Sequence, residues 1–128
     1  MDYLVFVEIL GKKYPMVFSI GVLQKMIARI GSYEDLNKVR SNIAGVIEHL
    51  SDFTYEMIRY GEKYCDYVDA EKPENAAVDE NGKWLPISVG FIETCVQGKD
   101  MEKILKTVVQ CMTMNQAIET KTKESKNA

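Results

Sequence analysis

The sequence has little of what metal sites and disulfide frameworks need. It contains one histidine and three cysteines in 128 residues. Cys65, Cys95 and Cys111 are an odd number and form no CxxC pair, and His49 stands alone, so we expect no metal ion. Unpaired cysteines of this kind are typical of buried free thiols in a reducing compartment. The sequence therefore predicts neither a metal centre nor a disulfide scaffold.

Long apolar runs and clustered positive charge are also missing. No apolar stretch reaches the roughly 20 residues that span a bilayer, and the opening Met1-Asp2-Tyr3 lacks the basic start of a signal peptide. The net charge is −3, and the 16 basic residues are spread along the chain, whereas phosphate binding requires clustered Lys and Arg. We expect a cytoplasmic protein that binds neither a membrane nor nucleic acid.

Catalytic motifs are absent as well. The chain has no GxSxG, no GxxxxGK[ST] and no GxGxxG. His49, Ser51 and Asp52 are close in sequence, but a catalytic triad is assembled by tertiary geometry and also needs an oxyanion hole. We expect no enzymatic activity and no cofactor.

The carboxylates that lie close together are better explained as a solvated helix face. They fall among basic residues and outside the apolar positions of the same region, and exposed carboxylates keep ordinary acidity. A small hydrolase or ligand-binding domain using these acids is the enzyme-class alternative. The carboxylates are Glu56, Glu62, Asp66 and Asp69, and the basic residues are Arg59 and Lys63.

What the sequence does contain is a small globular domain. Apolar residues make up 46% of the chain and charged residues 27%, which is typical of a folded soluble protein. Two β-branched and aromatic segments across Gly11–Lys13 predict a β-hairpin over 3–20. Helical patterns follow at about 20–30, 33–68, 87–97 and 100–118, with capping signals at Ser19 and Ser32. The prediction is an α+β fold, mostly α, with the hairpin packed on four to five helices in one domain over 1–118.

Two segments read differently from this domain. Residues 69–83 are acidic and contain Pro73 and Gly82, so we expect a mobile loop. Residues 119–128 are rich in Lys, Thr, Ser and Asn, so we expect a disordered tail.

A heptad pattern runs through 36–67 without interruption. Such a stripe needs a partner surface in the same domain, in a second copy, or in another protein. One helix over the whole region would be about 54 Å long, and a break near 48–52 is an equally good interpretation. The first series is Leu36, Ile43, Leu50, Met57 and Tyr64, and the second is Val39, Val46, Phe53, Tyr60 and Tyr67.

Tyrosines and methionines supply the candidate interaction residues. Tyrosine combines a large apolar ring with a polar tip, and methionine adapts to irregular partners, so both favour interfaces. The alternative is that the rings close the end of the helical core. The candidates are Tyr55, Tyr60, Tyr64, Tyr67, Met112 and Met114.

Several short motifs resemble one protein family. The run Gly11-Lys12-Lys13-Tyr14-Pro15-Met16-Val17-Phe18 and the later Gly31-Ser32-Tyr33-Glu34-Asp35-Leu36 look like the "GKxYPLxF" hairpin end and "GSxEDL" turn of tail assembly chaperones from long-tailed bacteriophages. Those of phages and prophages of Gram-positive hosts are most similar. Met57-Ile58-Arg59-Tyr60-Gly61-Glu62-Lys63-Tyr64 resembles the family's "LLxxGxKY" helix end. The resemblance covers about 3–115, although Ser19-Ile20-Gly21 and the uninterrupted heptad depart from the family pattern.

The resemblance implies a non-enzymatic assembly factor. Members of the family bind the long, helical tape measure protein in the host cytoplasm, help to recruit tail tube protein, and are absent from the mature virion. They tend to self-associate, and many also have a frameshifted longer form. The other interpretation is a helical scaffolding or regulatory protein that pairs with itself through the 36–67 stripe.

Overall fold

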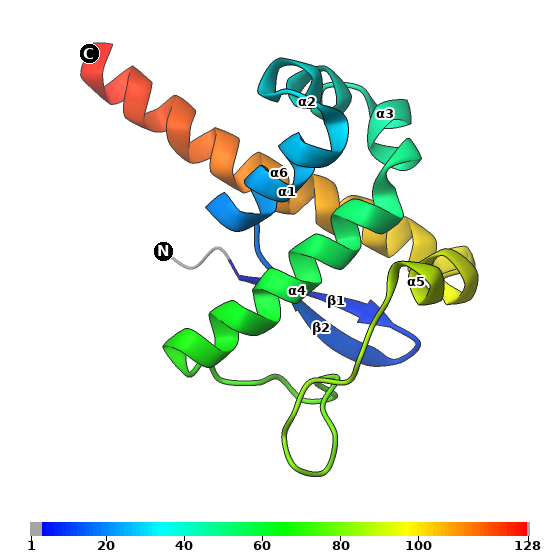
Figure 1. Ribbon diagram of the computed structural model, residues 1–128. Helices are drawn as coiled ribbons and strands as arrows, with labels where there is room; N and C mark the ends of the chain where they lie inside the picture. The colour runs from blue at the N-terminus through cyan, green and yellow to red at the C-terminus, as the bar shows by residue number, and fades with distance from the viewer. Residues whose placement is uncertain (1–3, 128) are drawn as a thin grey trace.

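The computed structural model describes the backbone of residues 4–127 and the side chains of residues 4–112. Across the described residues the chain forms a two-stranded hairpin and six helices, which confirms the predicted α+β, mostly helical fold (Figure 1). The elements are β1 (Val5–Ile9), β2 (Lys12–Met16), α1 (Ile20–Ile30), α2 (Tyr33–Arg40), α3 (Ile43–Glu48), α4 (Leu50–Val68), α5 (Val89–Cys95) and α6 (Gly98–Asn127).

The hairpin forms within the predicted range 3–20, but its turn comes earlier than the predicted Gly11–Lys13 connection, and Lys12 and Lys13 belong to β2. β1 and β2 are antiparallel, with Val5 opposite Met16 and Ile9 opposite Lys12. The turn consists of Leu10 and Gly11, whose φ angles of 51° and 79° match the twist of the strands. The Leu10 N–H donates to Asp100 Oδ2 at 3.3 Å, so the tip of the hairpin is attached to the start of α6.

A third extended segment lies beside the hairpin, within the 69–83 stretch for which the sequence predicts an acidic, mobile loop. The Lys13 N–H donates to the Asn75 carbonyl and the Ala77 N–H donates to the Lys13 carbonyl, each at 2.8 Å. Ala77 is completely buried, and Val78 forms a bridge with Trp84. The middle of this segment is therefore held against β2. Three small apolar residues, 76–78, lie between the acidic stretches of this segment, and they are able to pack against β2.

The heptad region is divided among three helices. The chain leaves the helical path at Ser41–Asn42 and again at His49, and the second break falls within the predicted 48–52 window. The first break was not predicted. Asn42 has extended backbone angles, and its Oδ1 accepts from the Ala44 N–H at 3.0 Å, so its side chain caps α3.

The core lies where α4 packs on β2 and α6 packs on β1 (Figure 1). α4 also contacts α1, α5 and α6, so it is the central helix of the fold. Its large buried apolar side chains are Phe53, Met57 and Ile58, and the partners from other elements include Val7, Ile9, Met16, Met26, Leu36, Val46, Ile104, Val108 and Met112.

α4 touches β2 main chain to main chain. A Cβ added to Gly61 would lie 2.4 Å from the Pro15 carbonyl oxygen and 2.5 Å from its carbon. Close by, the Val17 N–H donates to the Met57 carbonyl at 3.2 Å. Only a residue without a side chain permits this approach, which explains the glycine in an otherwise regular helix.

The two C-terminal helices also form in the predicted order. α5 begins after Ser88, whose Oγ accepts from the Phe91 N–H at 3.0 Å, and α6 contains the predicted helix over 100–118. The backbone of α6 continues to Asn127. The disordered tail expected over 119–128 stays a prediction, because it falls where side chains are not described.

Candidate protein-binding groove

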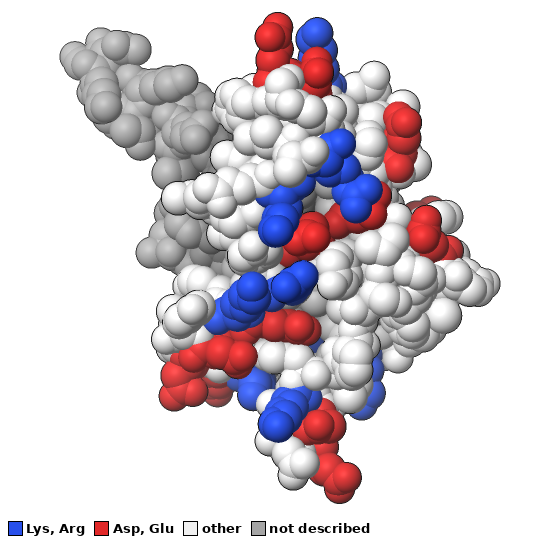
Figure 2. All heavy atoms as spheres, viewed as in Figure 1, with Lys and Arg blue, Asp and Glu red and all other residues white. Residues whose placement is uncertain are grey.

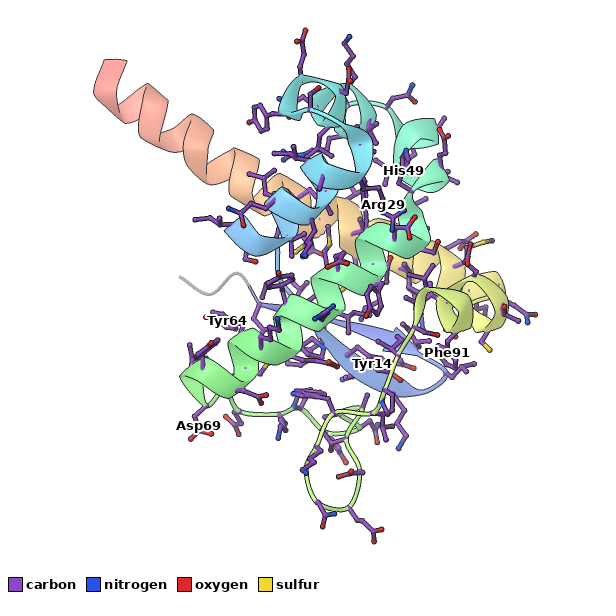
Figure 3. The ribbon with its side chains drawn as sticks, viewed as in Figure 1. Tyr14, Arg29, His49, Tyr64, Asp69 and Phe91 are labelled. Carbon is purple, nitrogen blue, oxygen red and sulfur yellow. The ribbon has the colours of Figure 1, made fainter. Side chains whose placement is uncertain are left out.

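A groove opens between the C-terminal half of α4 and the connection from β2 to α1. It has a volume of about 450 Å³, and Val17, Phe18 and Ser19 form one wall. The other wall is α4, which contributes Tyr60, Lys63, Tyr64 and Tyr67. Figure 3 shows Tyr64 near the C-terminal end of α4. The lining is therefore mostly apolar and aromatic.

The rings that line the groove are held by specific contacts. A Cβ added to Gly21 would lie 2.4 Å from Tyr60 Cε1, so the Tyr60 ring rests directly on the α1 backbone. Lys63 Nζ lies 4.8 Å from the centre of the same ring, and Arg40 Cζ lies 4.9 Å from the centre of the Phe18 ring. In such cation–π contacts the cation lies over one face of the ring and restrains the aromatic side chain.

The outer part of the groove presents large apolar side chains to solvent. Tyr67 is 89% exposed and Tyr64 is 36% exposed. Ile20, next to Ser19, is 74% exposed, and Val68 follows Tyr67 with 52%. Exposed apolar side chains beside a groove favour an interaction site, since burying them releases water.

The structure brings together three of the six predicted interaction residues. Tyr60, Tyr64 and Tyr67 line the groove. Tyr55 is half-buried and lines no part of it, and Met112 belongs to the core, so its side chain is not on the surface. Met114 falls outside the described side chains.

Sequence reasoning missed the other wall. The predicted hairpin over 3–20 includes Val17 and Phe18, yet these residues leave the hairpin after Met16 and line the groove with α4. The sequence feature that could have indicated this wall is Ser19-Ile20-Gly21, in which a glycine follows an apolar residue at the start of a helix. A glycine in a first helical turn often indicates close packing by a large neighbour.

A second hollow lies between α1 and the N-terminal half of α4. It has a volume of about 400 Å³, and its polar lining consists of Lys25, Arg29, Asp52 and Glu56, with apolar contributions from Met26, Ala28 and Phe53. Arg29 forms an ion pair with Asp52 at 3.2 Å. Figure 2 shows basic and acidic side chains close together over α1 and α4 on this face. The lining of this second hollow is therefore mostly charged, whereas the lining of the first is mostly aromatic.

The expected solvated face of carboxylates is only partly correct. Asp66 and Asp69 are exposed, but Glu56 and Glu62 are half-buried, and the Oε2 atom of each is buried without a hydrogen-bond partner. Burial, followed by the charge of Asp66, raises the pKa of Glu62 to about 7. Glu62 lines neither hollow, and its charge adds to burial in raising the pKa of Tyr14. Its perturbed pKa therefore reflects packing against β2.

The histidine and the cysteines considered in the sequence analysis have contacts that are typical of packing in the fold. His49 stacks on Phe53 with ring centres 5.6 Å apart. The three cysteines are free, and burial raises the pKa of Cys111 to about 11. In the described part of the chain, no three His, Cys, Asp or Glu side chains gather as a metal ion would require.

A search for membrane-spanning helices and three comparisons with known proteins complete the description. None of the described helices combines the length and the apolar character needed to cross a membrane. No family model matches the chain, and no match was found among curated proteins or solved structures.

Proposed function

We propose that this protein is a tail assembly chaperone that binds the tape measure protein in the bacterial cytoplasm and helps to recruit tail tube protein. The observation that carries the proposal is the aromatic groove between α4 and the β2–α1 connection. It adds a candidate client surface to the sequence resemblance. The role is binding, without an enzymatic step.

The chemistry of the groove suits a helical client. A tape measure protein is long and helical, and its apolar faces need cover before the tail is built. An amphipathic helix presents apolar side chains at i, i+3, i+4 and i+7, which is the form that hydrophobic grooves accept. Tyr64 and Tyr67 offer apolar area together with hydroxyl groups that stay in water, so the unoccupied surface remains soluble.

Self-pairing through a continuous 36–67 stripe is less well supported. Leu36, Val46 and Met57 are buried in the core of the chain, and the stripe bends at two breaks. A coiled coil needs these positions on one straight face. The exposed members of the stripe include Ile43 of α3 at 57% and Tyr67 of α4 at 89%, so they lie on different helices.

Co-expression with the tape measure protein encoded in the same genome tests the proposal. We expect the tape measure protein to become soluble and to co-purify with the wild-type chain. A Tyr64→Ser, Tyr67→Ser double variant should lose most of this effect, because it removes the exposed rings from the groove. Tail tube protein added to the purified complex should then bind to it.

Tyr33→Ser is the matched control. Tyr33 is 54% exposed on α2 and does not line the groove, so its loss removes a ring of the same kind from a different surface. The proposal fails if wild type neither solubilises nor co-purifies with the tape measure protein. It also fails in its choice of surface if Tyr33→Ser is as damaging as the double variant. A tail tube gene upstream and a very long tape measure gene downstream would support it independently.

A further inference from the structure

The aromatic groove ends at a ring that is fixed in place. Tyr60 packs on α1 at Gly21, where an added Cβ would lie 2.4 Å from Tyr60 Cε1 and 2.8 Å from Tyr60 Cζ. Because no side chain intervenes at Gly21, the ring has no space to move toward α1. The aromatic groove and the charged hollow share no lining residue. The aromatic groove is therefore a binding surface by itself, and its own residues decide what it accepts.

Positive charge lies against the rings of both walls of this groove. Lys63 is the only charged residue among the seven that line it, and its Nζ lies 4.8 Å from the centre of the Tyr60 ring. On the opposite wall, Arg40 Cζ lies 4.9 Å from the centre of the Phe18 ring. An occupant that reaches these rings therefore comes close to two cations.

The acidic residues in the same half of α4 lie on another side of the helix. At about 100° per residue, Glu62, Asp66 and Asp69 are about 120–180° around the helix axis from Tyr60. None of these three acids lines the groove. Within the described residues Lys63 forms no ion pair, although Asp66 is three positions further along α4. The groove therefore presents positive charge and no carboxylate of its own.

We infer that the client segment in this groove carries an Asp or Glu beside its apolar anchors, so that its carboxylate meets the Lys63 ammonium. This rests on the proposed function and specifies the chemistry of the client. Lys63 and Tyr67 are four residues apart on α4, about 6 Å along the helix axis. The carboxylate therefore belongs within about one helical turn of the apolar side chain that contacts Tyr67. A Lys or Arg in the same position of the client would be repelled.

Three labelled peptides test this charge requirement. Each is an alanine- and glutamine-based helix of about 18 residues with Leu and Phe on one face and, one turn away on that face, Glu, Gln or Lys. The peptides differ at this position only, so the apolar contacts stay constant. Fluorescence anisotropy gives the Kd of each peptide for wild type, Lys63→Glu and Lys63→Gln. Lys106→Glu is the control, because Lys106 is exposed on α6 and lines no part of the groove. Circular dichroism verifies that every variant is folded.

Wild type should bind the Glu peptide at least about threefold more tightly than the Lys peptide, with the Gln peptide between them. Lys63→Glu should reverse this order, and Lys63→Gln should reduce the difference between the Glu and Lys peptides. Lys106→Glu should keep the wild-type order.

Equal affinities of wild type for the Glu and Lys peptides, an unchanged order in Lys63→Glu, or no binding of any peptide would overturn the inference. The proposed function survives such a result if the tape measure protein still co-purifies with wild type, and it fails separately if the tape measure protein does not. A wild-type dimer that Lys63→Glu dissociates would assign the groove to a second copy and also overturn the inference.

Discussion

Replacing Gly61 with alanine should destabilise the fold more than any other glycine-to-alanine change within the described helices. The new methyl group would lie 2.4 Å from the Pro15 carbonyl oxygen, whereas ordinary van der Waals contact begins at 3.4 Å. The difference is about 1 Å. Because the obstructing atoms belong to the main chain of β2, the clash is relieved only by moving β2 away from α4.

The magnitude follows from two opposing terms. Forcing an extra methyl group into packed structure costs about 1–3 kcal/mol and more where the neighbours are rigid, so we take about 4 kcal/mol. Alanine in a helix interior gains about 1 kcal/mol over glycine. The net loss is therefore about 3 kcal/mol, which lowers Tm by roughly 10 °C for a domain of this size.

Two other glycines serve as controls. At Gly90 in α5 the nearest atom to a new Cβ is Ser88 Oγ at 4.0 Å, so Gly90→Ala should be neutral or slightly stabilising. At Gly21 the obstruction is the Tyr60 ring, a side chain that can move, so Gly21→Ala should have an intermediate cost of about 1–2 kcal/mol.

Urea denaturation followed by circular dichroism measures the free energy of unfolding of the three variants. The expected order of stability is Gly90→Ala, then Gly21→Ala, then Gly61→Ala. The reasoning is refuted if Gly61→Ala lies within about 0.5 kcal/mol of wild type, a change typical of unperturbed surface sites.

Three further predictions concern titration, thiol reactivity and capping. Glu62→Gln should stabilise the protein at pH 8 by about 1–2 kcal/mol, after allowance for partial exposure, and have little effect at pH 5. The sign follows because the pKa of Glu62 rises from 4.5 to about 7, so the folded state binds the extra proton and is stabilised as the pH falls through that window. Urea midpoints at the two pH values measure it, and an equal effect at both would contradict it. Cys111, whose pKa is raised to about 11, should react with a thiol reagent only on unfolding, whereas the half-buried Cys95 reacts faster; mass spectrometry of the labelled peptides decides the order. Asn42→Ala should cost about 1 kcal/mol in the same urea assay, because it removes the side chain that caps α3, and a neutral result would show that the break does not depend on the cap.

The sequence predicted those parts of the fold that depend on neighbours along the chain. The hairpin turn at Gly11 and the caps at Ser19 and Ser32 are local signals, and each appears in the structure. The break at Asn42 was also a local signal, but the uninterrupted apolar pattern obscured it. Heptad spacing indicates which residues are buried, but residues with this spacing can belong to several consecutive helices.

The parts that could not be predicted depend on tertiary contact. Ala77 pairs with Lys13, which is distant in sequence, and Gly21 is needed only because Tyr60 lies against it. The same limit explains the candidate site. The tyrosines were found by their spacing, but Phe18 joins them only because the chain turns out of β2 toward α4.

The glycine contact between α4 and β2 also determines the dimensions of the groove. One wall begins directly after β2 and the other is α4, so the contact of Gly61 with Pro15 fixes the separation of the walls through the main chain. Side chains at the edge of the groove can then change in the course of evolution while the width of the groove stays constant. Substitution of the exposed aromatic side chains can therefore change which polypeptide binds, while the main-chain contact between α4 and β2 is retained.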